Sequence, residues 1–307
     1  MAGDRKDRAM RGWLAAALAA VALGLAPAAG AQPSPSSGCG RPQAAERMTV
    51  SLTVQGAQRT ALVNVPPAAA RGAPLPVVVM FHAQSADSAS TELQTGLSWL
   101  GDRRGFITVY PNALGRDWAV AVPAGQPNAD VALVHALLAQ LDDTLCIDDS
   151  RIYGAGESNG ASFLSRWGCA LSDRFAAIAV VAGDDGIAPG CGPVHAISVL
   201  EVHGTGDVDM RYASGTAALG GVGVWPFLDR WFAWDRCPHG ALERRALGPR
   251  VLWLGRSNCT GGTAVAHLRL ADEPHAWPTL HGSGPAVRLS MRDVIWQFFT
   301  THRIARL

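Results

Sequence analysis

Gly154-Ala155-Gly156-Glu157-Ser158-Asn159-Gly160 follows directly on an apolar stretch that ends at Tyr153. Within this run, Gly156-x-Ser158-x-Gly160 is the spacing that places a serine on a sharp turn between a strand and a helix. Small flanking residues let the strand and the helix approach each other, because glycine has no Cβ atom. The N–H groups that open the helix would then face a negative charge that develops beside the serine. The run therefore predicts a nucleophile at Ser158, although ordinary glycine-rich turns also match five-residue patterns.

Strands and helices alternate along the rest of the chain. Continuous apolar runs, typical of strands buried on both faces, occupy 76–81, 106–110, 151–154, 176–181 and 196–202. A leading hairpin is expected over 48–54 and 60–65, and late strands over 251–254 and 264–270. Apolar spacing indicates helices over 91–103, 129–141, 159–171, 225–234 and 290–302. This alternation predicts one α/β domain over 48–307, with a mostly parallel central sheet, helices on both faces, and a site beyond the carboxyl ends of the strands.

The first 31 residues have the pattern of an export signal. Arginine and lysine at positions 5, 6, 8 and 11 precede an apolar stretch over 13–25, and Ala29-Gly30-Ala31 offers a cleavage site. The apolar stretch is too short to span a membrane stably. We expect a secreted or periplasmic protein whose residues 32–47 form a flexible lead-in. An alternative is lipid attachment at Cys39, although the leucine that usually precedes such a cysteine is missing.

All six cysteines lie after the expected cleavage site, at positions 39, 146, 169, 191, 237 and 259. An even number of cysteines in an exported protein indicates up to three disulfides. The Cys237–Cys259 pair is favoured, because both residues lie in loops that flank one strand, and the other pairings stay open. C-x-x-C and H-E-x-x-H motifs are absent, so we expect no metal and no cofactor. A net charge of +1 argues against a nucleic-acid partner.

A serine nucleophile of this kind needs an acid and a histidine later in the chain, in the order serine, acid, histidine. Asp207 follows the strand expected at 196–202, and Asp209 is its rival. His275 follows the strand at 264–270 on a loop that prolines make stiff, and His281 is its rival. Two further histidines, at positions 82 and 203, are expected to hold their loops through backbone hydrogen bonds.

Several motifs together resemble the secreted polyhydroxybutyrate-depolymerase-type esterases, a group that includes feruloyl esterases. The resemblance covers roughly residues 48–302. It is carried by Gly156-Glu157-Ser158-Asn159-Gly160, His203-Gly204-Thr205-Gly206-Asp207, His275-x-Trp277-Pro278, Val109-Tyr110-Pro111-Asn112-Ala113 followed by Trp118, Cys146-x-Asp148, Arg151-Ile152-Tyr153, Arg174-Phe175-Ala176-Ala177 and Ile295-Trp296-x-Phe298-Phe299. It implies an α/β-hydrolase fold and serine ester hydrolysis by Ser158, Asp207 and His275.

The chain departs from the pattern of these esterases in the loop that should complete the anion-binding site. The resemblance leads one to expect His-Gly after the third strand, whereas this chain reads His82-Ala83-Gln84. We expect the N–H of Asn159 to be one donor and the N–H of Ala83 or Gln84 to be the other. If position 83 needs a positive φ, alanine would be strained there. The glycines expected before the histidine are replaced by 272–274, Asp-Glu-Pro.

The substrate expected from these features is an ester. Aryl esters of the feruloyl type and short-chain hydroxyacyl esters both fit, and Trp118 and Trp277 could offer aromatic faces to them, although Trp118 could equally be a core residue. One alternative is a polyhydroxyalkanoate depolymerase acting on polymer. Another is a non-catalytic binding protein, which the departures at Ala83 and 272–274 suggest. We expect a monomer with a small-molecule or polymer ester substrate and no stable membrane span.

Overall fold

The computed structural model describes residues 34–123, 126–184, 186, 188, 190–216, 221–278 and 290–304. The expected export signal and the rival histidine at position 281 lie outside these residues. Among the described residues, no helix combines the length and the apolar character needed to cross a membrane.

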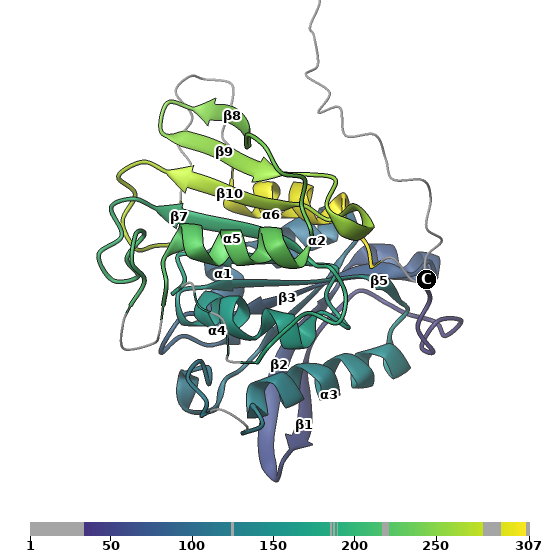
Figure 1. The fold of residues 1–307 in the computed structure, drawn as a ribbon. Helices are drawn as coiled ribbons and strands as arrows, with labels where there is room; N and C mark the ends of the chain where they lie inside the picture. The colour runs from purple at the N-terminus through teal and green to yellow at the C-terminus, as the bar shows by residue number, and fades with distance from the viewer. Residues whose placement is uncertain are drawn as a thin grey trace, which may run out of the picture.

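Ten strands form one sheet at the centre of the molecule (Figure 1). In spatial order they are β1 (Glu46–Val54), β2 (Ala57–Val65), β4 (Ile107–Pro111), β3 (Leu75–Phe81), β5 (Ile147–Glu157), β6 (Ala177–Val181), β7 (Ser198–Gly204), β10 (Val265–Leu270), β9 (Val251–Arg256) and β8 (Glu243–Gly248). The six strands from β4 to β10 run parallel, and the two at each edge are antiparallel. The mostly parallel sheet expected from the sequence is confirmed.

Helices cover both faces of this sheet, as expected. The helices are α1 (Ser88–Thr95), α2 (Leu97–Arg104), α3 (Ala129–Thr144), α4 (Asn159–Trp167), α5 (Val224–Trp234) and α6 (Met291–Thr300). α3, α4 and α5 share a core with one face, while α2 and α6 share a core with the other (Figure 1). β3 contributes to both cores, because Val77 and Val79 point to the first and Val78 and Met80 to the second. This two-sided burial explains its uninterrupted apolar sequence.

Apart from shifts of a few residues at element ends, the elements differ from the expected ones at four places. The strand expected over 151–154 is longer, because β5 runs from Ile147 to Glu157. The single helix expected over 91–103 is two helices, α1 and α2, because Gly96 between them adopts a left-handed conformation with φ 61°. The helix expected over 159–171 ends at Trp167 and continues only as a 3-10 turn. β8 has no counterpart among the expected strands, because it is an exposed edge strand with charged residues and no apolar alternation.

Residues 32–47 were expected to form a flexible lead-in, but the structure, which describes this segment from residue 34, anchors it at Ser36 and Cys39. Ser36 is buried, donates from Oγ to the Leu145 carbonyl at 2.6 Å, and accepts from the N–H of Ile147 at 2.9 Å. Cys39 is bonded to Cys146. The sulfur that lipid attachment would need is therefore already occupied, and the segment packs against the start of β5.

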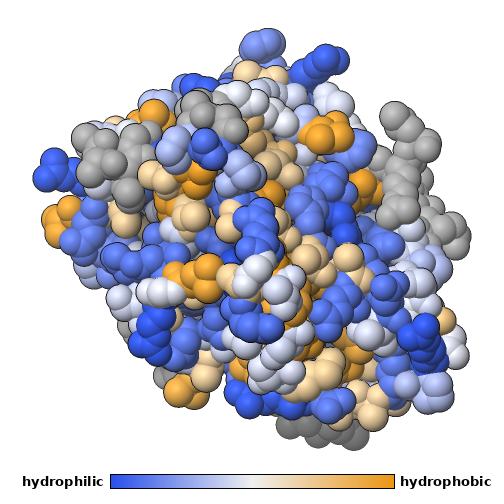
Figure 2. Space-filling model, turned by 90° about the horizontal axis from the view of Figure 1, so that it is seen from below, coloured by the Kyte–Doolittle hydropathy of each residue, from blue (hydrophilic) through white to orange (hydrophobic). Residues whose placement is uncertain are grey.

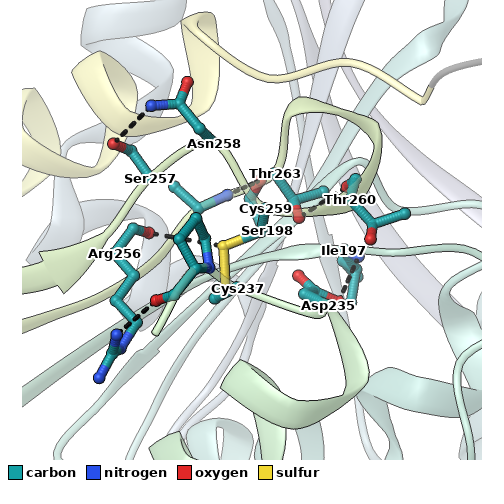
Figure 3. The surroundings of a disulfide bond; sticks show 12 residues. Ile197, Ser198, Asp235, Cys237, Arg256, Ser257, Asn258, Cys259, Thr260 and Thr263 are labelled. Atoms are coloured by element: carbon teal, nitrogen blue, oxygen red, sulfur yellow. Dashed lines mark hydrogen bonds between the residues drawn. A yellow bond between two sulfur atoms is a disulfide. The ribbon is translucent and has the colours of Figure 1, made fainter. Parts of the chain in front are cut away.

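Three disulfides cross-link the chain, Cys39–Cys146, Cys169–Cys191 and Cys237–Cys259. The favoured Cys237–Cys259 pairing is confirmed, and it joins the loop after α5 to the loop after β9 (Figure 3).

On the face seen in Figure 2, hydrophilic and hydrophobic residues alternate in small areas. Such a mixture is ordinary for a protein surface.

Candidate active site

Ser158 occupies the sharp turn that its flanking glycines indicate. It stands between the last residue of β5 and the first residue of α4, with φ 52° and ψ −116°. A serine rarely adopts this conformation, which persists only where neighbours hold it. Its N–H donates to the Val181 carbonyl of β6 at 3.0 Å, and its carbonyl accepts from the N–H of Ser162 at 2.8 Å. The turn is therefore tied to the next strand and to its own helix.

The glycines on either side of Ser158 are required by close backbone packing. A Cβ atom on Gly156 would lie 2.5 Å from the carbonyl oxygen of Gly160. A Cβ atom on Gly160 would lie 2.4 Å from the Phe81 oxygen and 2.6 Å from the His82 oxygen, at the end of β3. Both positions thus exclude any side chain, and the start of α4 is pressed against the loop that follows β3.

The acid and the histidine expected from the sequence meet the serine in space. The His275 imidazole lies between the other two side chains, with Nε2 2.8 Å from Ser158 Oγ and Nδ1 2.8 Å from Asp207 Oδ2. Asp207 follows β7 and His275 follows β10. Because these strands pair in parallel, both loops leave the sheet at the carboxyl ends of the strands. Of the two rival acids, the structure brings Asp207 to the histidine, and the exposed Asp209 donates its N–H to Asp207 Oδ1 at 3.0 Å.

The side chains of Ser158, His275 and Asp207 form an array, and the groups around it favour an ionised Asp207 and a basic His275. Burial alone would raise the pKa of Asp207, but hydrogen bonds from His203, His275 and the Met210 N–H hold that pKa well below its usual range. The hydrogen bond to Asp207 raises the pKa of His275 above its ordinary value, against the opposing effect of burial. An imidazole held in this way can accept a proton from Ser158 and hold it as a charged pair with Asp207.

The donors expected for the anion site lie around the same turn. Asn159 is the first residue of α4, so its N–H has no acceptor within that helix. Ala83 and Gln84 follow β3 in the loop that packs on Gly160. The expected strain at position 83 is absent, because the positive φ of this loop falls on Ser85, at 61°. Alanine therefore fits where the esterases that this chain resembles carry glycine.

The two tryptophans expected near the site differ in burial. Trp118 is only 3 % exposed, donates from Nε1 to the His82 carbonyl at 2.9 Å, and packs against Phe81. Its backbone N–H donates to Asn159 Oδ1 at 2.7 Å. These contacts support a core role for Trp118 rather than a face open to substrate. They also hold the loop after β3 to the turn at Ser158. Trp277 is half-buried, two residues after His275.

Histidines 82 and 203 hold their loops, as expected. His82 Nε2 accepts from the Ala113 N–H at 3.1 Å, and His203 Nε2 lies 2.6 Å from the Met210 carbonyl. His203 also contacts Asp207 Oδ2 at 3.3 Å, a contact that the expected backbone hydrogen bonds did not include.

Glu157, the residue before Ser158, is a further charged residue of this region. Its side chain is buried and accepts a hydrogen bond from Gln94 Nε2 of α1 at 3.2 Å. Burial raises the pKa of Glu157, while His275, Gln94 and the Trp277 backbone lower it in part. Its position directly before Ser158 in the sequence is the signal that could have located it here.

One group of possible metal ligands coincides with the array. Asp207, Asp209 and His275 each place one donor atom within 4.8 Å of the others. Asp207 and His275 are already bonded to each other and to groups of the chain, so these residues are better suited to proton transfer than to holding a cation.

Comparison with known proteins agrees with this architecture. Residues 59–219 match the family described as esterase PHB depolymerase. The chain is 27% identical over 196 residues to feruloyl esterase D of Neurospora crassa, covering 59% of this chain and 65% of that protein. It is 30% identical over 195 residues to a probable feruloyl esterase C of Aspergillus niger, covering 63% of this chain and 64% of that protein. The chain thus spans less than two thirds of the length of these relatives.

Solved structures share the fold at low sequence identity. An acetyl xylan esterase from Aspergillus awamori superposes with a TM-score of 0.60 at 14% identity, covering 83% of this chain and 99% of that one. A mutant feruloyl esterase module from Clostridium thermocellum, complexed with sinapinate, gives 0.53 at 11% identity, covering 88% of this chain and 93% of that one. The fold is the α/β-hydrolase fold that the motifs implied, and with half of its length matched by the family model, the chain belongs to the esterase PHB depolymerase family.

Proposed function

We propose that this protein is a serine carboxylic-ester hydrolase in which Ser158, His275 and Asp207 act as the catalytic triad. The observation that carries the proposal is the position of His275, whose two ring nitrogens contact Ser158 Oγ and Asp207 Oδ2 at 2.8 Å each. The strained turn at Ser158 adds support, because a backbone conformation of this kind is retained where it serves to present a side chain.

The reaction proceeds through an acyl-enzyme. His275 takes the proton of Ser158 as Oγ attacks the ester carbonyl, and the N–H groups of Asn159 and of Ala83 or Gln84 stabilise the resulting oxyanion. His275 then gives its proton to the departing alcohol. Water, deprotonated by the same imidazole, attacks the acyl group and releases the acid. Asp207 stays ionised throughout and holds the imidazole in the required tautomer.

The substrate that we propose is an aryl ester of the feruloyl type. The curated relatives described above are named feruloyl esterases, and the structural neighbours are named as esterases of acetyl xylan and as a feruloyl esterase module. With Trp118 in the core, the partly buried Trp277, two residues after His275, is the aromatic side chain that we propose for contact with such a ring.

We also propose that residues 1–31 direct export and that residues 48–307 form one catalytic domain. The basic and apolar pattern of the N-terminus supports export, and three disulfides suit an oxidising compartment.

Labelling with a fluorophosphonate tests the proposal directly. The wild-type protein should be modified at Ser158, and Ser158→Ala should remain unlabelled and lose on the order of 10⁶ in kcat, as in serine proteases. Hydrolysis of methyl ferulate, p-nitrophenyl butyrate and amorphous polyhydroxybutyrate should rank the ferulate first. An unlabelled wild-type protein would instead support the non-catalytic alternative, and preferred release of 3-hydroxybutyrate would support the depolymerase.

A further inference from the structure

A second histidine contacts the same carboxylate oxygen of the proposed triad acid as His275 does. His203, on β7, is buried and places Nε2 3.3 Å from Asp207 Oδ2 and 2.6 Å from the Met210 carbonyl oxygen. A carboxylate oxygen and a carbonyl oxygen both accept hydrogen bonds and do not donate them. Nε2 of His203 must therefore carry a proton.

The other ring nitrogen of His203 faces a fully buried carboxylate. Nδ1 lies 3.0 Å from Oε1 of Glu201, two residues earlier on β7, whose side chain is 0 % exposed. Oε2 of Glu201 contacts Nδ1 of His267 on β10, and His267 Nε2 lies 2.9 Å from the Tyr212 hydroxyl. Two histidines thus share one glutamate inside the sheet.

The charge state of Glu201 decides the charge of His203. Burial alone would raise the pKa of Glu201, but His267 and His203 lower it below its ordinary value. An ionised carboxylate accepts only, so Nδ1 of His203 also carries a proton. Asp184, on the loop after β6, also interacts electrostatically with His203, and its negative charge favours the cation.

We propose that His203 is a permanently protonated imidazolium, held by Glu201, that donates a second hydrogen bond to Asp207 and positions this carboxylate for His275. The inference rests on the proposed triad. It makes His203 and Glu201 positioning residues, because they act on the reacting groups only through Asp207.

This arrangement has a consequence for the pH dependence of catalysis. Since His203 Nε2 and His275 Nδ1 contact the same oxygen at 3.3 and 2.8 Å, they lie within about 6 Å of each other. A fixed positive charge at that distance disfavours a second one, so His203 lowers the pH at which His275 becomes protonated. Removing only the charge of His203 should move the acid limb of the rate profile to higher pH, by roughly 0.5–1 unit.

His203→Gln tests this, because the glutamine amide can still donate to Asp207 but carries no charge. Profiles of kcat/KM against pH with p-nitrophenyl acetate should show the acid limb displaced upward in this variant. The matched control is His302→Gln, which changes another buried histidine, bonded to the Phe298 carbonyl on α6. It should lower thermal stability and leave the limb in place. An unmoved limb in an active His203→Gln protein would overturn the inference.

A second measurement keeps the inference testable if His203→Gln does not fold. Long-range proton–nitrogen NMR of the wild-type protein labelled with ¹⁵N-histidine should show, at pH 8, a buried imidazole with both nitrogens protonated. A neutral His203 at that pH would refute the proposal. Failure of the triad is a separate outcome, because Ser158→Ala would then keep its activity whatever the state of His203.

Discussion

Replacing Gly160 by alanine should disturb the turn at Ser158 and the proposed anion site together. The new Cβ would stand 2.4 Å from the Phe81 oxygen and 2.6 Å from the His82 oxygen, and both are backbone atoms that cannot rotate away. Relief of the contact requires α4 and the loop after β3 to move apart by several tenths of an ångström. These two segments carry the N–H groups of Asn159 and Ala83, so the donors would separate.

The expected size of the effect follows from two opposing terms. Overpacking a tight core costs about 1–3 kcal/mol. Alanine recovers at most about 1 kcal/mol relative to glycine inside a helix. Because both contacts are with backbone atoms, the cost lies at the upper end, and we expect Gly160→Ala to lose about 2 kcal/mol of stability. Activity should fall further, by on the order of 10²-fold in kcat, because small displacements of groups that hold the transition state are costly.

Thermal unfolding and p-nitrophenyl acetate hydrolysis measure the two effects. Gly192→Ala is the matched control, because no atom lies within 4 Å of its added Cβ and its φ is not positive. That variant should retain wild-type stability within about 0.5 kcal/mol and full activity. Wild-type kcat and melting temperature in Gly160→Ala would show that α4 and the β3 loop are not in the close contact described.

Three further predictions concern protons and cross-links. Activity should fall as the pH drops through the pKa of His275, which its bond to Asp207 raises above 6.5, and a constant rate down to pH 4 would exclude His275 as the base. Burial raises the pKa of Asp235 to about 7, so the folded state holds an extra proton from about pH 4 to 7 and stability falls as pH rises through that window (Figure 3). Asp235→Asn should therefore raise the melting temperature at pH 8 and leave it nearly unchanged at pH 4, whereas equal gains at both values would contradict the assignment. Replacing Cys39 and Cys146 by serine opens a cross-link over 107 residues and should cost about 2–5 kcal/mol, measured by urea unfolding, and a loss below 0.5 kcal/mol would show that the N-terminal anchor is dispensable.

The sequence predicts the meeting of Ser158, Asp207 and His275 because each of them follows a local rule. Ser158 has a fixed pattern of small neighbours, and Asp207 and His275 each follow an apolar strand. Parallel strands end at one edge, so loops that are far apart in sequence must meet there. This rule predicts which loops meet, but it does not predict which of Asp207 and Asp209 contacts His275. That depends on the short turn after β7, in which the N–H groups of Asp209 and Met210 both donate to Asp207.

The buried partners behind the array could not be predicted in the same way. Glu201 lies inside an apolar strand where a charged residue has no local explanation, and its partner His267 is 66 residues away on β10. Only the register between β7 and β10, which places His267 opposite Glu201, brings them together. Likewise, β8 is held by pairing with β9 rather than by any pattern of its own. Features made by pairing between distant segments leave little trace in the order of residues.

The strained turn at Ser158 is held because its helix is fixed at both ends to the same neighbouring segment. At the start of α4, the Ser158 N–H is bonded to the last residue of β6. Beyond its end, Cys169 is cross-linked to Cys191 in the loop that follows β6. A conformation that costs about 1–3 kcal/mol relaxes unless the structure around it removes the alternatives. With both ends of α4 tied to β6 and its loop, and Gly160 pressed against β3, the helix can neither slide nor tilt to release the serine, so Oγ stays directed at His275.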